Sequence, residues 1–116
     1  MQTSNFARAA GDHSIKPVSI ARYAPRWYSG RRYLALAPTR QMLKMGEDEY
    51  RVAYQEILDR LDPRKVYEDL GPDAVLLCWE KPGEFCHRRL VAEWLEIHLG
   101  IKVPEVGPDD RQEKLF

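Results

Sequence analysis

The segment spanning residues 76–89, LLCWEKPGEFCHRR, collects many of the side chains in this sequence that could do chemistry. It holds both cysteines of the chain, one of its three histidines, two glutamates and two adjacent arginines. These residue types could form a pocket for an anion, a thiol site or a metal site. The spacing of the residues bears differently on each of these three possibilities.

Glu80 is a candidate for acid–base chemistry because it follows a strongly apolar run directly. Partial desolvation at the end of a buried strand could poise this carboxylate as a general acid or base. The same position would also suit an acceptor for a ribose hydroxyl. The alternative is an ordinary loop acid that pairs with Lys81 or Arg88.

An anion pocket is predicted where the helix after residues 82–83 begins. A helix that begins near Phe85 has unpaired amide groups in its first turn, and these can bind an anion. Arg88 lies in that first turn, where a positive charge opposes the helix dipole. Contact with a phosphate or carboxylate would explain an arginine there, and pairing with Glu80 or Glu84 is the alternative.

The cysteines are predicted to be walls of this pocket. On a helical wheel Cys86 aligns with Leu90 and His87 with Val91, so both face the sheet, and Cys78 lies on the buried strand. With two cysteines eight positions apart, we expect reduced thiols. A thiolate at Cys86, stabilised by the helix N-terminus and His87, is the reactive alternative.

A metal site is not predicted, although Cys78, Cys86 and His87 could contribute zinc ligands. The close CxxC pair that is usual in zinc sites is missing, and a fourth ligand would have to come from elsewhere. Adjacent helical residues also diverge, which argues against a Cys86–His87 nucleophile pair. His87 stays beside Glu80 as a candidate catalytic residue, and no cofactor is expected.

A second candidate surface spans residues 22–33, RYAPRWYSGRRY, in which four arginines alternate with four aromatic residues. Arg22 and Arg26 could hold phosphate groups, and Trp27 and Tyr28 could stack on a base. A loop that packs its aromatic rings on the core and solvates its arginines would have the same composition.

The elements that must position these residues are read from periodicity and from turn residues. Apolar residues at helical spacing predict helices over 48–61, 64–70 and from about 85 to Gly100, and a short helix over 39–45. The uniformly apolar run 73–79 predicts a strand buried on both faces. Further strands are predicted over 2–7, 16–23 and 101–106.

This order of elements predicts an α/β fold: a small, mostly parallel sheet of about four strands, flanked by helices. Residues 1–106 are expected to form a single domain, with 107–116 as a polar C-terminal tail. Ligands of such sheets bind beyond the carboxyl ends of the strands. Residues 78–84 and 23–27 are both predicted to lie at that edge.

Composition narrows the class of protein. Of the 116 residues, 44% are hydrophobic, and no apolar run approaches the length of a membrane span. The first residues lack a continuous apolar signal core, so a soluble cytoplasmic protein with no membrane partner is expected. Residues 1–45 carry a net charge of +7 and residues 46–116 a net charge of −7. Such segregation would favour an anionic partner, unless the two halves interleave in space.

The run LLCWEKPGEFCHRRLVAEWL, residues 76–95, resembles the signature of the family catalogued as domain of unknown function 488. That signature combines a hydrophobic strand, Cys-x-Glu, Cys-His-Arg and an Ala-Glu/Asp-Trp-Leu helix. The run SIARYAPRWYSGRRYLALAP, residues 19–38, resembles the compact branch of the family. The resemblance covers about residues 1–105 and implies a compact α/β domain in which the two surfaces form one site. It also implies that Asn5, in the first strand, joins the pocket wall.

Together these features predict a protein directed at a nucleotide or nucleic acid, with an anion pocket at the sheet edge. Cleavage of an N-glycosidic bond is the reaction that a carboxylate beside a phosphate pocket would suit, which would make the protein a hydrolase. A non-catalytic nucleotide sensor or sequestering protein is the first alternative, and a zinc or thiol protein is the second. Oligomeric state is not predicted.

Overall fold

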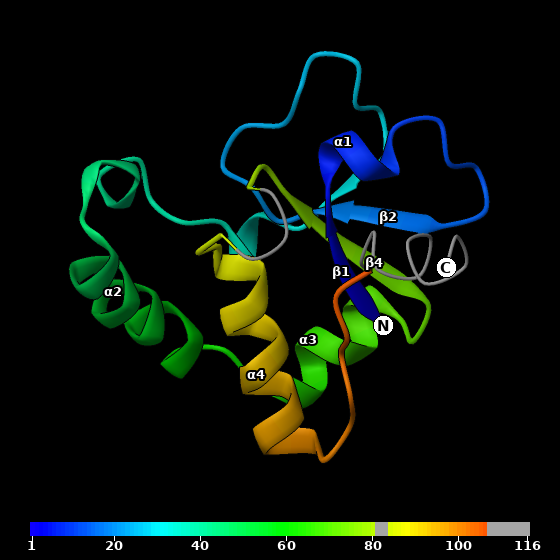
Figure 1. The fold of residues 1–116 in the computed structure, drawn as a ribbon. Helices are drawn as coiled ribbons and strands as arrows, with labels where there is room; N and C mark the ends of the chain where they lie inside the picture. Colours follow the sequence, from blue (N-terminus) through cyan, green and yellow to red (C-terminus); the bar gives the residue numbers. More distant parts are fainter. Residues whose placement is uncertain (81–83, 107–116) are drawn as a thin grey trace, which may run out of the picture.

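The structure is a computed structural model that describes residues 1–80 and 84–106 (Figure 1). The turn predicted at Pro82 and Gly83 and the polar tail predicted over 107–116 lie outside the described residues. Among the described residues, no helix is long and apolar enough to cross a membrane.

A four-stranded, all-parallel sheet forms the centre of the fold and confirms the predicted α/β class. The strand order is β1-β4-β2-β3. The strands are β1 (Gln2–Asn5), β2 (Lys16–Ser19), β3 (Arg31–Arg32) and β4 (Ala74–Cys78). All five residues of β4 are buried, as its uninterrupted apolar sequence predicted. Its register places Cys78 beside Asn5 of β1 and Leu77 beside Ser19 of β2.

In the described part of the chain four helices accompany the sheet: α1 (Phe6–Ala9), α2 (Glu47–Asp59), α3 (Pro63–Leu70) and α4 (His87–Leu99). Three acidic residues open α2, where they complement the helix dipole. Asp62 caps α3 through the amide of Arg64, and Pro63 occupies its first position. Gly100, with a φ of 68°, ends α4 in the left-handed conformation that glycine tolerates. Two single 3-10 turns, η1 (Leu34–Leu36) and η2 (Met42–Lys44), precede α2.

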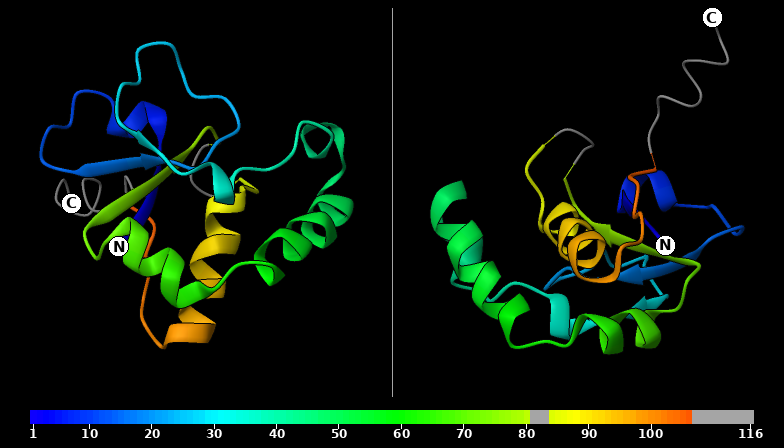
Figure 2. Two further views of the ribbon diagram at one scale, coloured as in Figure 1. Left: turned by 180° about the vertical axis from the view of Figure 1, so that it is seen from behind. Right: turned by 90° about the horizontal axis from the view of Figure 1, so that it is seen from below.

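The sheet separates two apolar cores. Ala74 and Leu76 of β4 pack into the larger core, together with residues of α2, α3 and α4. Val75 and Leu77 point to the opposite face, where they meet Phe6 of α1 and Tyr28. Figures 1 and 2 show α3 and α4 on one side of the sheet and α1 on the other. Because strand side chains alternate, Cys78 faces the α4 side, like Ala74 and Leu76.

The prediction of a strand over residues 101–106 is wrong. The chain forms only an isolated parallel bridge between Glu105 and Thr3, beside β1. The amide of Thr3 donates to the Pro104 carbonyl at 2.9 Å, and the amide of Val106 donates to the Thr3 carbonyl at 2.7 Å. Pro104 has no amide hydrogen to add to a ladder, which limits the pairing to this point.

Other boundaries also differ from the prediction. The first strand ends at Asn5, because the Asn5 side chain accepts a hydrogen bond from the Arg8 amide at 2.9 Å and caps α1 there. Strand β2 ends at Ser19 rather than at residue 23, and the helix predicted over 39–45 is the single turn η2. The short strand β3 was not predicted, because its two arginines lie in what looks like a loop.

Candidate functional site

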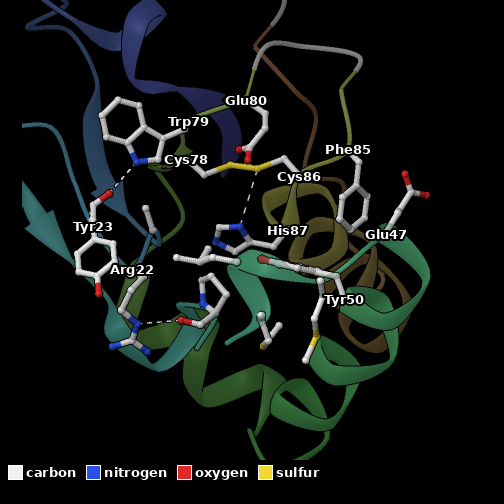
Figure 3. Close-up of a pocket in the computed structure, with 15 residues that line it drawn as sticks. Arg22, Tyr23, Glu47, Tyr50, Cys78, Trp79, Glu80, Phe85, Cys86 and His87 are labelled. Atoms are coloured by element: carbon white, nitrogen blue, oxygen red, sulfur yellow. Dashed lines mark hydrogen bonds between the residues drawn. A yellow bond between two sulfur atoms is a disulfide. The ribbon is translucent and has the colours of Figure 1, made fainter. Parts of the chain in front are cut away.

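A cavity of about 390 Å³ lies beyond the carboxyl ends of β2 and β4 (Figure 3). Its walls come from four parts of the chain: the residues after β2, those after β4, the start of α4, and the region from η2 into α2. This is the edge at which a parallel sheet binds its ligands, and the volume lies within the usual range of small-molecule sites.

Five of the residues proposed from the sequence meet in this cavity. Arg22 enters from the β2 side and Cys78 and Glu80 from the β4 side, while Cys86 and His87 enter from the start of α4. Figure 3 shows Arg22 on the opposite side of the cavity from the two sulfur atoms. The Arg22 Nε donates to the Pro38 carbonyl at 2.8 Å, which fixes this side chain at the wall.

The predicted base-stacking residues, in contrast, lie outside the cavity. Tyr28 is buried on the α1 face, with its ring 5.4 Å from that of Phe6 and its hydroxyl donating to the Arg31 carbonyl at 2.6 Å. Trp27 is 56% exposed but also contacts Phe6. Arg26 is exposed and does not line the cavity. The second core therefore draws this part of the segment to the other face of the sheet.

Arg88 lies in a buried ion pair with Glu105 and does not line the cavity. Its side chain is fully buried, and its Nη2 lies 2.6 Å from Glu105 Oε2, while Nε also donates to the same carboxylate. Its Nη1 donates to Cys78 Sγ at 2.9 Å. The charge of Glu105, which follows α4 in the sequence, explains an arginine at the positive end of this helix. Arg88 and Glu105 are 17 positions apart, and no local sequence pattern predicts that they pair.

Asn5 does not line the cavity but holds the backbone of Glu80, which does. Its Nδ2 donates to the Glu80 carbonyl at 3.2 Å, while its Oδ1 caps α1. One side chain therefore ties the end of β1 to the point where the chain leaves β4. This role fits the predicted meeting of Asn5 with the site, although not as a surface that a ligand would touch.

Aromatic side chains supply much of the surface of the cavity, and two of them, Tyr50 and Phe85, were not predicted to lie there. Tyr23, Tyr50, Trp79 and Phe85 line the cavity. Trp79 is held by its Nε1, which donates to the Tyr23 carbonyl at 2.7 Å. Burial, and after it the negative charge of Glu80, raises the pKa of Tyr50, so the Tyr50 hydroxyl stays protonated at neutral pH. The helical spacing of Tyr50 is that of a core residue, so the sequence pattern did not indicate that Tyr50 also lines the cavity.

His87 is neutral at physiological pH. Burial is the main cause that lowers its pKa to about 4, and the neighbouring Arg88 charge acts in the same direction. Its Nε2 lies 2.8 Å from the Ile20 carbonyl, which can only accept a hydrogen bond, so Nε2 carries the proton. Nδ1 is then an unprotonated acceptor, 3.9 Å from Cys86 Sγ.

Cys78 and Cys86 are joined by a disulfide, which corrects the expectation of reduced thiols. Within the described ranges, Cys78, Cys86 and His87 also form a cluster whose possible metal-ligand atoms lie within 4.8 Å of one another. A zinc ion would need both sulfurs as free thiolates, so the bonded pair and a metal exclude each other.

Comparison of the chain with family models, with curated proteins and with solved structures finds no match.

Proposed function

We propose that the cavity binds a nucleotide or a nucleotide unit of a nucleic acid. The observation that carries this proposal is the convergence, at the carboxyl ends of β2 and β4, of aromatic surfaces, one arginine and two carboxylates from separate parts of the chain. Each chemical part of a nucleotide has a matching partner in this set. The base requires a flat apolar surface, the phosphate a cation, and the sugar hydroxyls an acceptor.

Trp79 and Tyr23 are the surfaces we assign to the base. Both are about half exposed, at 54% and 52%, and both line the cavity, so a ring can reach them. Stacking of a base on an aromatic side chain contributes about 1–3 kcal/mol. Arg22 is the cation we assign to the phosphate, because the hydrogen bond from its Nε to the Pro38 carbonyl holds the guanidinium at the cavity wall.

Glu80 and Glu47 are the acceptors we assign to the sugar. For a catalytic version of the proposal, Glu80 also assists hydrolysis of the N-glycosidic bond. Its carboxylate stabilises the positive charge that develops on the sugar and takes a proton from the attacking water. The water oxygen bonds to the anomeric carbon, the carbon–nitrogen bond breaks, and the base leaves with its electron pair and gains a proton.

Binding is tested by thermal denaturation with nucleoside monophosphates, nucleosides and inorganic phosphate in parallel. We expect the monophosphates to raise Tm with concentration, as RT ln(1 + [L]/Kd) requires. Arg22→Met and Trp79→Ala should each remove most of this shift. The chain supplies matched controls: Arg26→Met and Trp27→Ala change similar exposed residues outside the cavity and should keep the shift. If no monophosphate raises Tm, or the control variants lose the shift equally, the proposal is wrong.

The catalytic version is tested separately, by release of free base from nucleotides and short DNA and RNA. We expect release by the wild type, a strong reduction in Glu80→Gln, and little change in Glu49→Gln, which alters an exposed acid of α2. Binding without release would reduce the proposal to its non-catalytic alternative, a nucleotide sensor or sequestering protein. Equal release by the wild type and Glu80→Gln would remove Glu80 from the reaction.

Membership of the family catalogued as domain of unknown function 488 is also a proposal, supported by Cys78, Glu80, Cys86, His87 and Arg88. Four of these residues line the cavity, and the fifth contacts a sulfur in its wall. A solved structure from that family can test the relationship. The same strand order with the two cysteines adjacent would support it, and a different strand order would refute it.

A further inference from the structure

The Cys78–Cys86 bond lies in a setting that matches reactive rather than purely structural disulfides. The two residues come from different elements, the end of β4 and the start of α4, and both line the cavity. A bond that only braced the core would have no need of an opening to small molecules. Here the sulfurs form part of the wall that a ligand would meet.

Each sulfur has a partner that would stabilise its reduced form. The Arg88 Nη1 donates to Cys78 Sγ at 2.9 Å, and a guanidinium favours a thiolate over a thiol. Cys86 is the N-cap residue of α4, a helix of 13 residues, and its own side chain makes no capping hydrogen bond. The dipole of that helix favours a negative charge at Cys86.

His87 places a hydrogen-bond acceptor beside the same pair. Because its Nε2 is the protonated nitrogen, the lone pair of Nδ1 faces Cys86 Sγ at 3.9 Å. With a pKa of about 4, Nδ1 can accept a hydrogen bond from the Cys86 thiol but is too weak a base to hold its proton. The thiolate that attacks a disulfide is therefore favoured by the helix dipole at Cys86.

We propose that Cys78 and Cys86 form a redox-active dithiol–disulfide pair that exchanges with a low-molecular-weight disulfide or thiol entering through the cavity. Cys86 is the attacking residue, because it lies at the N-cap of α4, where the helix dipole favours its thiolate. Cys78 is the resolving residue. This inference does not depend on the proposed nucleotide ligand, because its probe is a thiol reagent.

The reaction has two balanced steps. The Cys86 thiolate attacks one sulfur of the small disulfide, forms a mixed disulfide and expels one thiolate. The Cys78 thiolate then attacks Cys86 Sγ, closes the protein bond and expels the second thiolate. The two protons of the cysteines pass to the two released thiolates, so the protein loses two electrons and the small disulfide gains them. In the reverse direction Cys78 leaves as a thiolate beside Arg88.

The first experiment equilibrates the full chain in buffers of varied reduced and oxidised glutathione and measures the two redox forms by mass after thiol alkylation. We expect a reversible transition between the dithiol and the internal disulfide as the ratio changes. A pair that stays bonded in every buffer is purely structural and overturns the proposal. A pair that never closes, or reduced protein that keeps one zinc ion and resists oxidation, also overturns it.

The second experiment assigns the roles of the two cysteines. With oxidised glutathione, Cys78→Ser should accumulate a stable adduct on Cys86, because the resolving thiol is missing. Cys86→Ser should form an adduct on Cys78 much more slowly. Circular dichroism confirms that each variant is folded. Equal adduct formation by the two variants, or none by either, would contradict the assignment.

The third experiment tests Arg88 as a positioning residue through the redox equilibrium. Arg88→Met should require a reduced-to-oxidised glutathione ratio about tenfold more reducing at the midpoint, since one charge-assisted bond to the thiolate is lost. The matched control is Arg89→Met, whose guanidinium donates to Thr3 Oγ1 and the Val103 carbonyl and touches no sulfur. An equal shift in both variants would contradict the role of Arg88. If Arg88→Met does not fold, the first two experiments decide the proposal.

Discussion

Two regions of the molecule have similar residue types but differ in burial and in their position relative to the cavity. They are the junction between β4 and α4 and the segment spanning residues 22–33. Both contain arginines and aromatic side chains. At the junction, Arg88 is fully buried, while Arg26 in the segment is exposed. Trp79 lines the cavity, whereas Trp27 lies outside it. Composition therefore marks both regions as candidates but does not say which side chains reach the site.

The difference comes from where each region leaves the sheet. β4 has a strand on either side, so it ends in the middle of the sheet edge, between β1 and β2. The segment leads from β2 to the edge strand β3, and its Tyr28 joins the core on the α1 face, as does Ala21 just before it. Within the segment, Arg22 and Tyr23 touch the cavity and the residues after them do not.

The largest contrast is expected between the two arginines. Arg88→Met should lower the free energy of unfolding by about 3–5 kcal/mol, because it leaves the Glu105 carboxylate without its buried partner. Arg26→Met should change stability by no more than about 0.5 kcal/mol, as is usual for exposed residues. Urea denaturation of both variants measures the difference. Similar values would mean that the buried ion pair does not hold the junction together.

A pH effect specific to the junction is expected from His87. Its pKa is about 4 in the folded protein and about 6.5 in an unfolded chain, so between these values the unfolded state binds more protons. The contribution of neutral His87 is therefore complete above about pH 6.5 and is lost as pH falls toward 4, by at most about 1.4 kcal/mol per pH unit.

Denaturation midpoints measured across this pH range should thus show a shallower slope for His87→Gln than for the wild type. His13→Gln removes an exposed histidine and should keep the wild-type slope. A wild-type slope in His87→Gln would place the acid sensitivity in other groups of the protein.

A smaller loss of stability is expected at Asn5, which ties β1 to the junction. Asn5→Ala removes the cap of α1 and the hydrogen bond to the Glu80 carbonyl, and should cost about 1–2 kcal/mol. Asn5→Asp keeps an acceptor that can cap α1 but has no donor for the Glu80 carbonyl. Its stability should therefore lie between that of the wild type and that of Asn5→Ala. Equal stability of Asn5→Asp and Asn5→Ala in urea would show that the cap contributes nothing.

The smallest effect is expected in the segment, at Tyr28. Tyr28→Phe removes the hydroxyl that donates to the Arg31 carbonyl and should cost about 1 kcal/mol, while nucleotide binding stays unchanged. Tyr23→Phe, at the cavity, should leave stability nearly unaltered. Chemical denaturation and ligand-induced Tm shifts separate the two roles. Loss of nucleotide binding in Tyr28→Phe would mean that Tyr28 does contribute to the ligand site.

The fold class and one side of the site could be predicted because they depend on local patterns. The uniformly apolar β4 predicted a central parallel strand, and its end predicted the position of Glu80. What could not be predicted depends on contacts between distant residues. The partner of Arg88 is Glu105, the face taken by Tyr28 is set by Phe6, and the sulfur bond requires α4 to dock against β4.

The strand order also sets the sequence of events in folding. β4 lies between β1 and β2 and pairs with both, so a growing chain cannot join these two strands until residue 78 has been synthesised. Pairing between distant segments slows folding, because the entropy cost of loop closure comes before the stabilising contacts form. Glu105 is added later still. The cavity wall and its sulfur bond are therefore expected to form only after nearly the whole described chain has left the ribosome.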